Sequence, residues 1–149
     1  MAISRGAGTE IIRSASFYDL AAATNTKLII GVQHHIYTVL SVIIYSRASY
    51  TPFNVELHLT GYDSDNGTSA QDMRIFKNSI QTEETFVWND KFSFNGYEPV
   101  DFSGAMDSAA DQDAIADQGS SVAQYLWLET GSASDALNCF ITYIDQNNA

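Results

Sequence analysis

Calcium binding is the first chemistry that the sequence suggests, because Asp63, Asp65 and Asn66 place oxygen ligands close together in a turn-rich loop. An EF-hand loop requires glycine at its sixth position and a bidentate glutamate at its twelfth. Counted from Asp63, Gly67 is the fifth residue and Arg74 is the twelfth. The loop therefore does not follow the EF-hand pattern.

A second group of oxygen ligands lies further along the chain, and one loop could fold them around Ca²⁺. This group is Asp107, Asp111, Asp113 and Asp117. A solvated acidic loop has the same composition and is the commoner structure. We therefore predict no metal site and no cofactor.

The histidines do not suggest a chelating pair. His34 and His35 are adjacent, so on a strand their side chains point to opposite faces and do not hold one ion together. His58 lies on the polar side of an alternating strand, and we predict that it is a surface residue.

Catalytic residues are not evident. Nucleophilic catalysis requires a base beside the nucleophile and a third group that orients the base. The sequence has no Gly-x-Ser-x-Gly elbow, no Cys–His pairing suggested by position and no phosphate-binding glycine motif. Glu83 and Glu84 are adjacent and are expected to diverge. A hydrolase with two carboxylates across a cleft is the last-ranked alternative, and we predict a protein that is not an enzyme.

Aromatic residues raise a carbohydrate-binding module as another alternative, because sugars stack on exposed rings. The candidates for such a platform are Trp88, Trp127, Tyr62, Tyr97 and Tyr125. Trp88 alternates with Phe86 in a strand, which is typical of a sandwich core. Tyr62 and Tyr97 lie next to glycine and are better candidates for exposed contact residues.

Cys139 is the only cysteine, so the chain forms no internal disulfide and no zinc site built on cysteines. It lies in the apolar run from Leu137 to Ile144. This position favours a small core residue over a reactive thiol.

The charge of the chain excludes some partners. Seven basic and 18 acidic residues give a formal net charge of −11, which repels phosphate backbones. We therefore predict no nucleic-acid partner. No apolar stretch approaches the roughly 20 residues of a membrane span, and Met1–Gly6 does not resemble a secretory signal. These features predict a soluble protein made in a cytoplasm.

Short apolar strands run from end to end, separated by Gly, Asn, Asp and Ser and without βαβ spacing. The clearest alternation lies at 53–60, whereas both phases of 36–47 are apolar, so we expect that strand to be covered on both faces. Residues 73–76 could begin a strand or a short helix. We expect strands at 16–20, 27–32, 36–47, 53–60, 83–88, 91–94, 124–130 and 137–145. About eight strands predict an all-β, antiparallel sandwich that is jelly-roll-like.

Two segments lie outside this strand pattern. Met1–Arg13 is predicted to be an N-terminal arm that orders on a neighbouring subunit, because its isoleucines would be costly to leave in water, and residues 14–149 are predicted to form one domain. Glu98–Asp117 carries six acidic residues and no Lys or Arg. It is predicted to be a surface insertion, with one or two helical turns in Ala109–Ala116.

The order and residue classes of these strands resemble small virion proteins of tailed bacteriophages, especially head-decoration or capsid cement proteins. The segments that carry the resemblance are Ser16–Leu20, Thr38–Arg47, Val55–Thr60, the pair Glu83–Trp88 and Lys91–Phe94, and the closing strand Asn138–Ile144. The acidic insertion and the loop Asp63–Gly67 are longer than in compact members of this class. No motif is matched residue by residue, so the resemblance transfers no functional residues.

This resemblance implies a structural virion protein that decorates and stabilises a capsid shell through multivalent non-covalent contacts. Its partners would be the major capsid protein or other virion subunits, and the chain would form a homo-oligomer, with a trimer favoured. The implied location is the outer capsid surface after synthesis in the host cytoplasm, where the acidic surface does not face packaged DNA. A neck, tail or fibre-associated subunit is the virion alternative.

Overall fold

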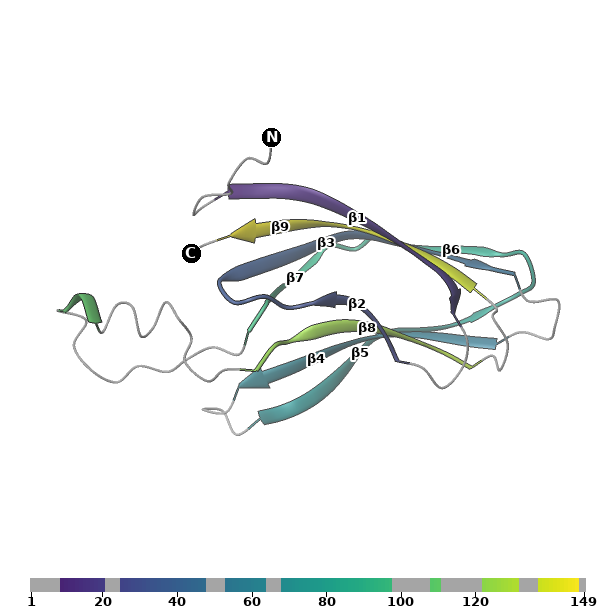
Figure 1. Cartoon of the computed structure of the whole chain (residues 1–149). Coiled ribbons are helices and arrows are strands. Elements are labelled where there is room, and N and C mark those ends of the chain that lie inside the picture. Colours follow the sequence, from purple (N-terminus) through teal and green to yellow (C-terminus); the bar gives the residue numbers. More distant parts are fainter. Residues whose placement is uncertain are drawn as a thin grey trace.

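The computed structural model describes residues 9–20, 25–47, 53–63, 68–97, 108–110, 122–131 and 137–147. Within these ranges the chain forms two packed antiparallel sheets (Figure 1). The strands are β1 (Thr9–Leu20), β2 (Thr26–Ile30), β3 (His35–Ser46), β4 (Phe53–Asp63), β5 (Thr68–Ile80), β6 (Thr85–Trp88), β7 (Phe92–Asn95), β8 (Tyr125–Thr130) and β9 (Leu137–Asn147).

The strand order is that of a jelly roll. One sheet has the order β1-β9-β3-β6, with β7 also pairing with β3, and the other has the order β2-β8-β4-β5. Strand β6 pairs with Val42–Tyr45, and β7 pairs with Ile36–Val39, so the two act as one strand interrupted by a bulge. When β6 and β7 are counted as one strand, the first strand (β1) pairs with the last (β9), and the second (β2) pairs with the next to last (β8). This nested pairing is the order of a jelly roll. The predicted all-β sandwich with jelly-roll character is confirmed.

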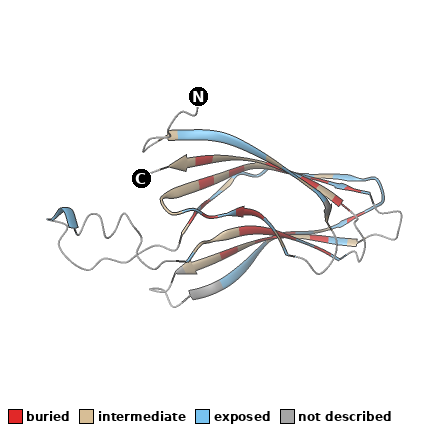
Figure 2. Cartoon of the chain, in the orientation of Figure 1, coloured by how far each residue is buried: buried red, intermediate tan, exposed pale blue. Residues whose placement is uncertain are grey.

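The core lies between the two sheets, because alternate residues of each strand point toward the opposite sheet. Buried residues occur on the central strands of both sheets, whereas β1 and β5, at the edges, are mostly exposed (Figure 2). The fully buried apolar side chains include Val39, Val42, Ile44, Val55, Leu57, Ile80, Leu126, Leu137 and Ile141.

A close backbone approach ties the two sheets together beyond β2 and β7. The Gly31 amide donates to the Gln124 carbonyl (2.8 Å), and the Gln124 amide donates to the Gly96 carbonyl (2.8 Å). A Cβ atom placed on Gly31 would lie 1.8 Å from the Gly96 oxygen. Both positions therefore require glycine for space, a constraint that the sequence pattern alone did not reveal.

The first strand is longer than the sequence pattern predicted. Residues 9–13, which the sequence analysis assigned to the arm, pair with Tyr143–Asn147 of β9 as part of β1. Their apolar residues find a sheet of this same chain, which corrects the arm boundary at Arg13. Residues 1–8 lie outside the described residues.

The other predicted segments are placed as follows. Residues 73–76, predicted as a strand or a short helix, belong to strand β5. Of the predicted acidic insertion, the structure describes only residues 108–110, and Ala109 and Ala110 there have helical geometry.

Candidate functional site

The sandwich has two outer faces, and they are the candidate functional surfaces. We call the outward side of β2, β8, β4 and β5 the polar face. We call the outward side of β1, β9, β3 and β6 the apolar face. The two faces differ in which side chains the strand alternation turns toward solvent.

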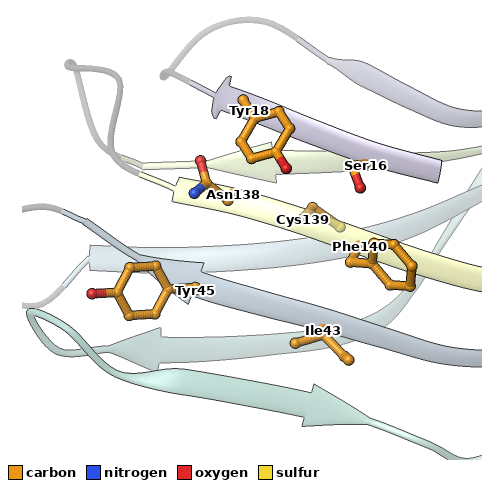
Figure 3. A pocket seen from close by; sticks show the side chains of 7 residues that line it. All are labelled: Ser16, Tyr18, Ile43, Tyr45, Asn138, Cys139 and Phe140. Atoms are coloured by element: carbon orange, nitrogen blue, oxygen red, sulfur yellow. The ribbon is translucent and has the colours of Figure 1, made fainter.

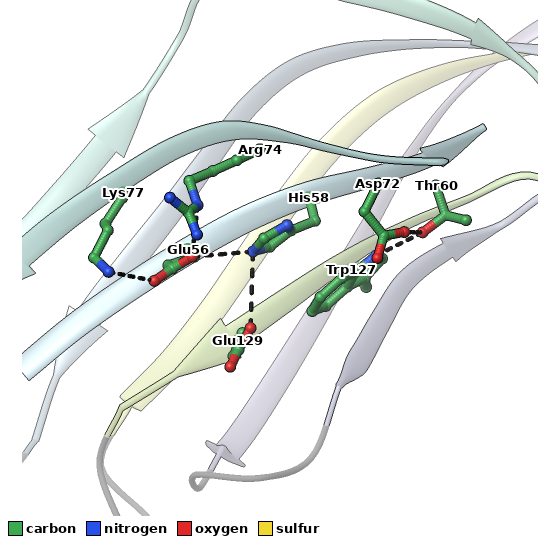
Figure 4. A network of polar contacts seen from close by, with 8 residues as sticks. All are labelled: Glu56, His58, Thr60, Asp72, Arg74, Lys77, Trp127 and Glu129. Atoms are coloured by element: carbon green, nitrogen blue, oxygen red, sulfur yellow. Dashed lines mark hydrogen bonds and ion pairs between the residues drawn. The ribbon is translucent and has the colours of Figure 1, made fainter. Parts of the chain in front are cut away.

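The polar face carries an ion-pair network centred on Glu56 (Figure 4). The Arg74 Nε atom lies 2.7 Å from Glu56 Oε2, and the Lys77 Nζ atom lies 2.8 Å from Glu56 Oε1. The hydrogen bond from Lys77 is the main reason that the pKa of Glu56 is lowered, although partial burial opposes this shift. Both carboxylate oxygens are thus engaged by cations from β5.

The centre of the polar face is a stacked pair of rings. The His58 and Trp127 rings are 4.1 Å apart and 9° from parallel. The Trp127 Nε1 atom donates to Thr60 Oγ1 (2.9 Å), and the Thr60 hydroxyl donates to Asp72. These contacts link β8, β4 and β5 across the sheet. They also leave His58 only 7% exposed and Trp127 only 6% exposed.

Two predictions about this face need correction. His58 does point outward, as the alternation predicted, but it is buried because the Trp127 ring covers it. Trp127 is in turn too buried to stack on a sugar. Trp88, which its alternation with Phe86 predicted to be a core residue, lies 5.4 Å from Phe76, ring centre to ring centre, and packs against the core of the sandwich, so that prediction is confirmed.

A metal ion has one possible ligand set among the described residues, and it lies in this network. Ligand atoms of Glu56, His58 and Glu129 lie within 4.8 Å of one another. A divalent cation there would have to displace Arg74 and Lys77 from Glu56, which would remove two ion pairs and place cations beside the metal. The arrangement therefore acts as a structural cross-link between strands.

The apolar face carries no charged side chain along most of its length. Residues that are directly opposite each other form the row Ser16, Phe140, Ile43 and Val87 across four strands. Of these, Val87 is 50% exposed and Phe140 is 39% exposed. The outward residues of the strands are Ile12, Ser14, Ser16, Tyr18, Thr38, Ser41, Ile43, Tyr45, Thr85, Val87, Ser93, Asn138, Phe140, Thr142 and Ile144. Glu10 and Arg47 mark the ends of this uncharged surface, and the exposed residues Asp90 and Lys91 lie at its edge, between β6 and β7.

One end of the apolar face is hollowed (Figure 3). The hollow has a volume of about 130 Å³ and is lined by Ser16, Tyr18, Ile43, Tyr45, Asn138, Cys139 and Phe140. Its rim thus combines two tyrosine rings with aliphatic and aromatic carbon. Such a shape accepts an apolar side chain.

Asp145 of the same sheet lies on its inward side, where it contacts Arg13 and His35. Asp145 is 3% exposed, and its two oxygens lie 2.7 Å from Arg13 Nε and 2.6 Å from His35 Nδ1. Tyr37 packs beside this cluster, and its hydroxyl accepts a hydrogen bond from the Val32 amide (3.1 Å). Burial raises the pKa of Tyr37 to about 12, and the negative charge of Asp145 adds to the shift.

The remaining predicted residues are placed as follows. Cys139 is buried in the core cluster, as predicted, and burial raises the pKa of its thiol to about 12. His34 has a left-handed backbone (φ 65°) at the turn before β3, while the ring of His35 contacts Asp145. Glu83 and Glu84 lie in or beside one turn, where Glu84 accepts a hydrogen bond from the Gln81 amide (2.6 Å).

Several other predicted residues are partly or wholly undescribed. The side chain of Asp63, and residues 65, 66, 107, 111, 113 and 117, lie outside the described part of the structure. Tyr62, Tyr97 and Tyr125 are partly buried, and the Lys27 ammonium lies 4.2 Å from the centre of the Tyr125 ring. Among the residues described, no helix is long and apolar enough to cross a membrane.

Comparisons with known proteins give only distant likenesses. No family model matches the chain, and no curated protein matches it. Among solved structures, a protein of Bacillus endospore appendages, described as disulfide-linked pili, is similar over 100% of this chain and 97% of its own length, with 12% identity and a TM-score of 0.44.

Two structures of infectious bursal disease virus are also similar to this chain. The Gt strain structure has 10% identity, a TM-score of 0.38 and coverage of 95% of this chain and 32% of that one. The T13 particle structure has 8% identity, a TM-score of 0.34 and coverage of 93% and 36%. Likenesses at this level carry no argument about function.

Proposed function

We propose that the chain is a structural, non-enzymatic virion protein that decorates and stabilises a phage capsid shell through several non-covalent contacts. The observation that carries this proposal is the apolar face, which is uncharged and solvent-exposed in a chain with a net charge of −11. Seven of its fifteen outward residues are apolar or aromatic, and among them Val87 is 50% exposed and Phe140 is 39% exposed. Exposed apolar side chains that cluster on a soluble protein mark interaction surfaces.

The energetic basis of such a role is burial of surface. Covering apolar surface contributes roughly 25 cal/mol per Å², so the exposed carbon of Phe140, Ile43 and Val87 gains free energy only when another surface covers it. A shell presents the same binding site many times, so modest contacts act together when the protein is itself oligomeric. A homo-oligomer on the outer surface of the shell, with the major capsid protein as its partner, would meet this requirement.

An N-terminal arm of residues 1–8 would be attached to the folded domain at Thr9. Thr9 lies opposite Asn147 at one end of the first sheet, and residues 1–8 precede it. Arg13 contacts Asp145 inside the sandwich and so belongs to the fold. We propose that residues 1–8, locally basic through Arg5, contribute to binding on the shell.

Two experiments test this function. Quantitative mass spectrometry of purified particles should find hundreds of copies per particle. A dozen or fewer copies would instead indicate a neck, tail or fibre subunit, and complete absence from particles would overturn the proposal. In the second experiment, a variant that lacks residues 2–8 should bind expanded capsids more weakly than the full chain. This deletion leaves β1 intact, whereas a deletion to residue 13 would also remove the Arg13–Asp145 pair.

A further inference from the structure

We propose that Gln124 is a clamp that closes one end of the sandwich beneath residues 98–121, so that the domain is complete without this segment. The inference goes beyond the proposed function and does not depend on it. Residues 98–121 lie between β7 and β8 and carry six of the 18 acidic residues of the chain. They contain the acidic insertion that the sequence predicted.

The clamp uses every polar group of Gln124. Its backbone amide donates to the Gly96 carbonyl, and its carbonyl accepts from the Gly31 amide, each over 2.8 Å. Its side-chain oxygen accepts from the Tyr62 amide (2.7 Å), and its side-chain nitrogen donates to the Asn95 carbonyl (2.9 Å). This single residue, just before β8, therefore ties together the ends of β2, β4 and β7, which belong to both sheets.

The chain leaves and re-enters the domain at one place. Tyr97, which directly precedes the segment, forms an antiparallel bridge with Ala123, the second residue after it. Such partners have Cα atoms about 4.5–5.5 Å apart, and a loop of about three to five residues is enough to join them. The 24 residues from 98 to 121 are thus far more than the connection requires.

The residues that hold this neck come from the strands on either side of the segment. Phe94 of β7 and Leu126 of β8 belong to the buried core cluster. A Cβ atom placed on Gly96 would lie 2.1 Å from the Val32 oxygen, so the backbones are in close contact there. Residues 108–110, the described part of the segment itself, are exposed. This arrangement supports a domain that is closed before the segment begins.

The test is removal of the segment. In an excised variant a Gly-Asn-Gly linker joins Tyr97 to Val122, and in a replaced variant a Gly/Ser sequence of equal length takes the place of residues 98–121. The excised variant should unfold at or above the temperature of the full chain, because a shorter loop costs less closure entropy and six acidic residues are gone. The replaced variant should unfold within about 3 °C of the full chain.

A substitution tests the clamp directly. Gln124→Ala should lower the thermal midpoint by at least about 5 °C, because the Tyr62 amide and the Asn95 carbonyl lose their partner. The loss should be the same in the full chain and in the excised variant, since the clamp holds the strands rather than the segment. Gln71→Ala, at an exposed glutamine of β5, is the matched control and should shift the midpoint by less than about 2 °C.

The outcomes decide the inference whether or not the protein is found in virus particles. A midpoint more than about 5 °C lower in both the excised and the replaced variant would show that residues 98–121 are part of the folded domain, and would overturn it. A Gln124→Ala variant as stable as the Gln71→Ala control would also overturn it. A loss confined to the excised variant would assign the strain to the short linker, and the unchanged replaced variant would then support the inference.

Discussion

The two outer faces of this sandwich differ in where the charged side chains of each sheet lie. On the polar face, Glu56, Arg74 and Lys77 point outward and pair with one another above the sheet. In the other sheet, Arg13 and Asp145 pair beneath the strands, and the outward side is left to apolar and hydroxyl side chains. The chemistry of each outer face therefore depends on which side of a strand bears the charged residues. A sheet has an uncharged outer side when its charged residues lie on the inner side.

A second difference concerns aromatic residues. Trp127 on the polar face is held by His58 and Thr60 and is almost fully buried. Phe140 on the apolar face is 39% exposed. The aromatic ring at the centre of the polar face is thus covered within one chain, whereas the ring of Phe140 on the apolar face remains partly in water.

The largest expected effect separates these two aromatic residues. Trp127→Ala should destabilise the isolated domain by about 3 kcal/mol, because it removes a buried ring that stacks on His58 and donates to Thr60 of β4. Phe140→Ala should cost within about 1 kcal/mol, because much of that ring is already in water. Urea unfolding at a protein concentration low enough to keep the chain monomeric would measure both. Equal losses would show that the two faces do not differ in the way described here.

A smaller effect is expected from the charges that point inward. Asp145→Asn should lower the free energy of unfolding by about 1–2 kcal/mol, because Arg13 and His35 both lose a charged acceptor. Arg13 is about half exposed and can turn toward water, which limits the loss. Thermal unfolding of the variant beside Asn138→Ala, an outward substitution on the same strand, provides the comparison. An unchanged midpoint for Asp145→Asn would mean that the buried pair contributes nothing.

The ion-pair network of the polar face should make the free energy of unfolding depend on pH. The pKa of Glu56 is lowered in the folded state, so its contribution is complete above the ordinary value of 4.5 and is lost as the pH falls through the folded pKa. Glu56→Gln should cost roughly 1 kcal/mol at neutral pH and less in acid, since Arg74 and Lys77 are about half exposed. Unfolding curves of both proteins from pH 7 to pH 3 should therefore converge. Parallel curves would assign the acid sensitivity to other carboxylates.

The smallest effect is expected on the apolar face of the isolated chain. Tyr18→Ser should change the free energy of unfolding by less than about 0.5 kcal/mol, because the ring is 68% exposed. The same substitution removes one wall of the hollow and, under the proposed function, should weaken association with expanded capsids, measured as occupancy of the particles. A large loss of stability without any loss of association would assign Tyr18 to the fold rather than to the interface.

The fold class was predictable from residue pattern because a sandwich depends on local alternation. Phe53–Thr60 alternates apolar and polar residues, and its apolar positions Val55 and Leu57 are fully buried. The outward position of His58 followed from the same alternation, but its burial did not. That burial depends on Trp127, which lies 69 residues later in the chain and directly opposite His58 in the sheet.

The apolar face was only half predictable. Both phases of 36–47 are apolar, which predicted a strand covered on two sides. The structure places Val42 and Ile44 in the core and leaves Ile43 and Tyr45 each 37% exposed. The second cover is therefore absent from the described part of the chain, and identifying the face required the register that aligns Ile43 with Phe140 and Val87.

The sequence by itself determined most of the strands, the acidic charge and the burial of Cys139, because each depends on composition or on the order of neighbouring residues. Only the tertiary structure decided the jelly-roll order, the pairing of Asp145 with Arg13 and the chemistry of each outer face. The physical reason is strand register: a shift of one residue exchanges the two sides of a strand, and contacts across the sheets join residues more than a hundred positions apart.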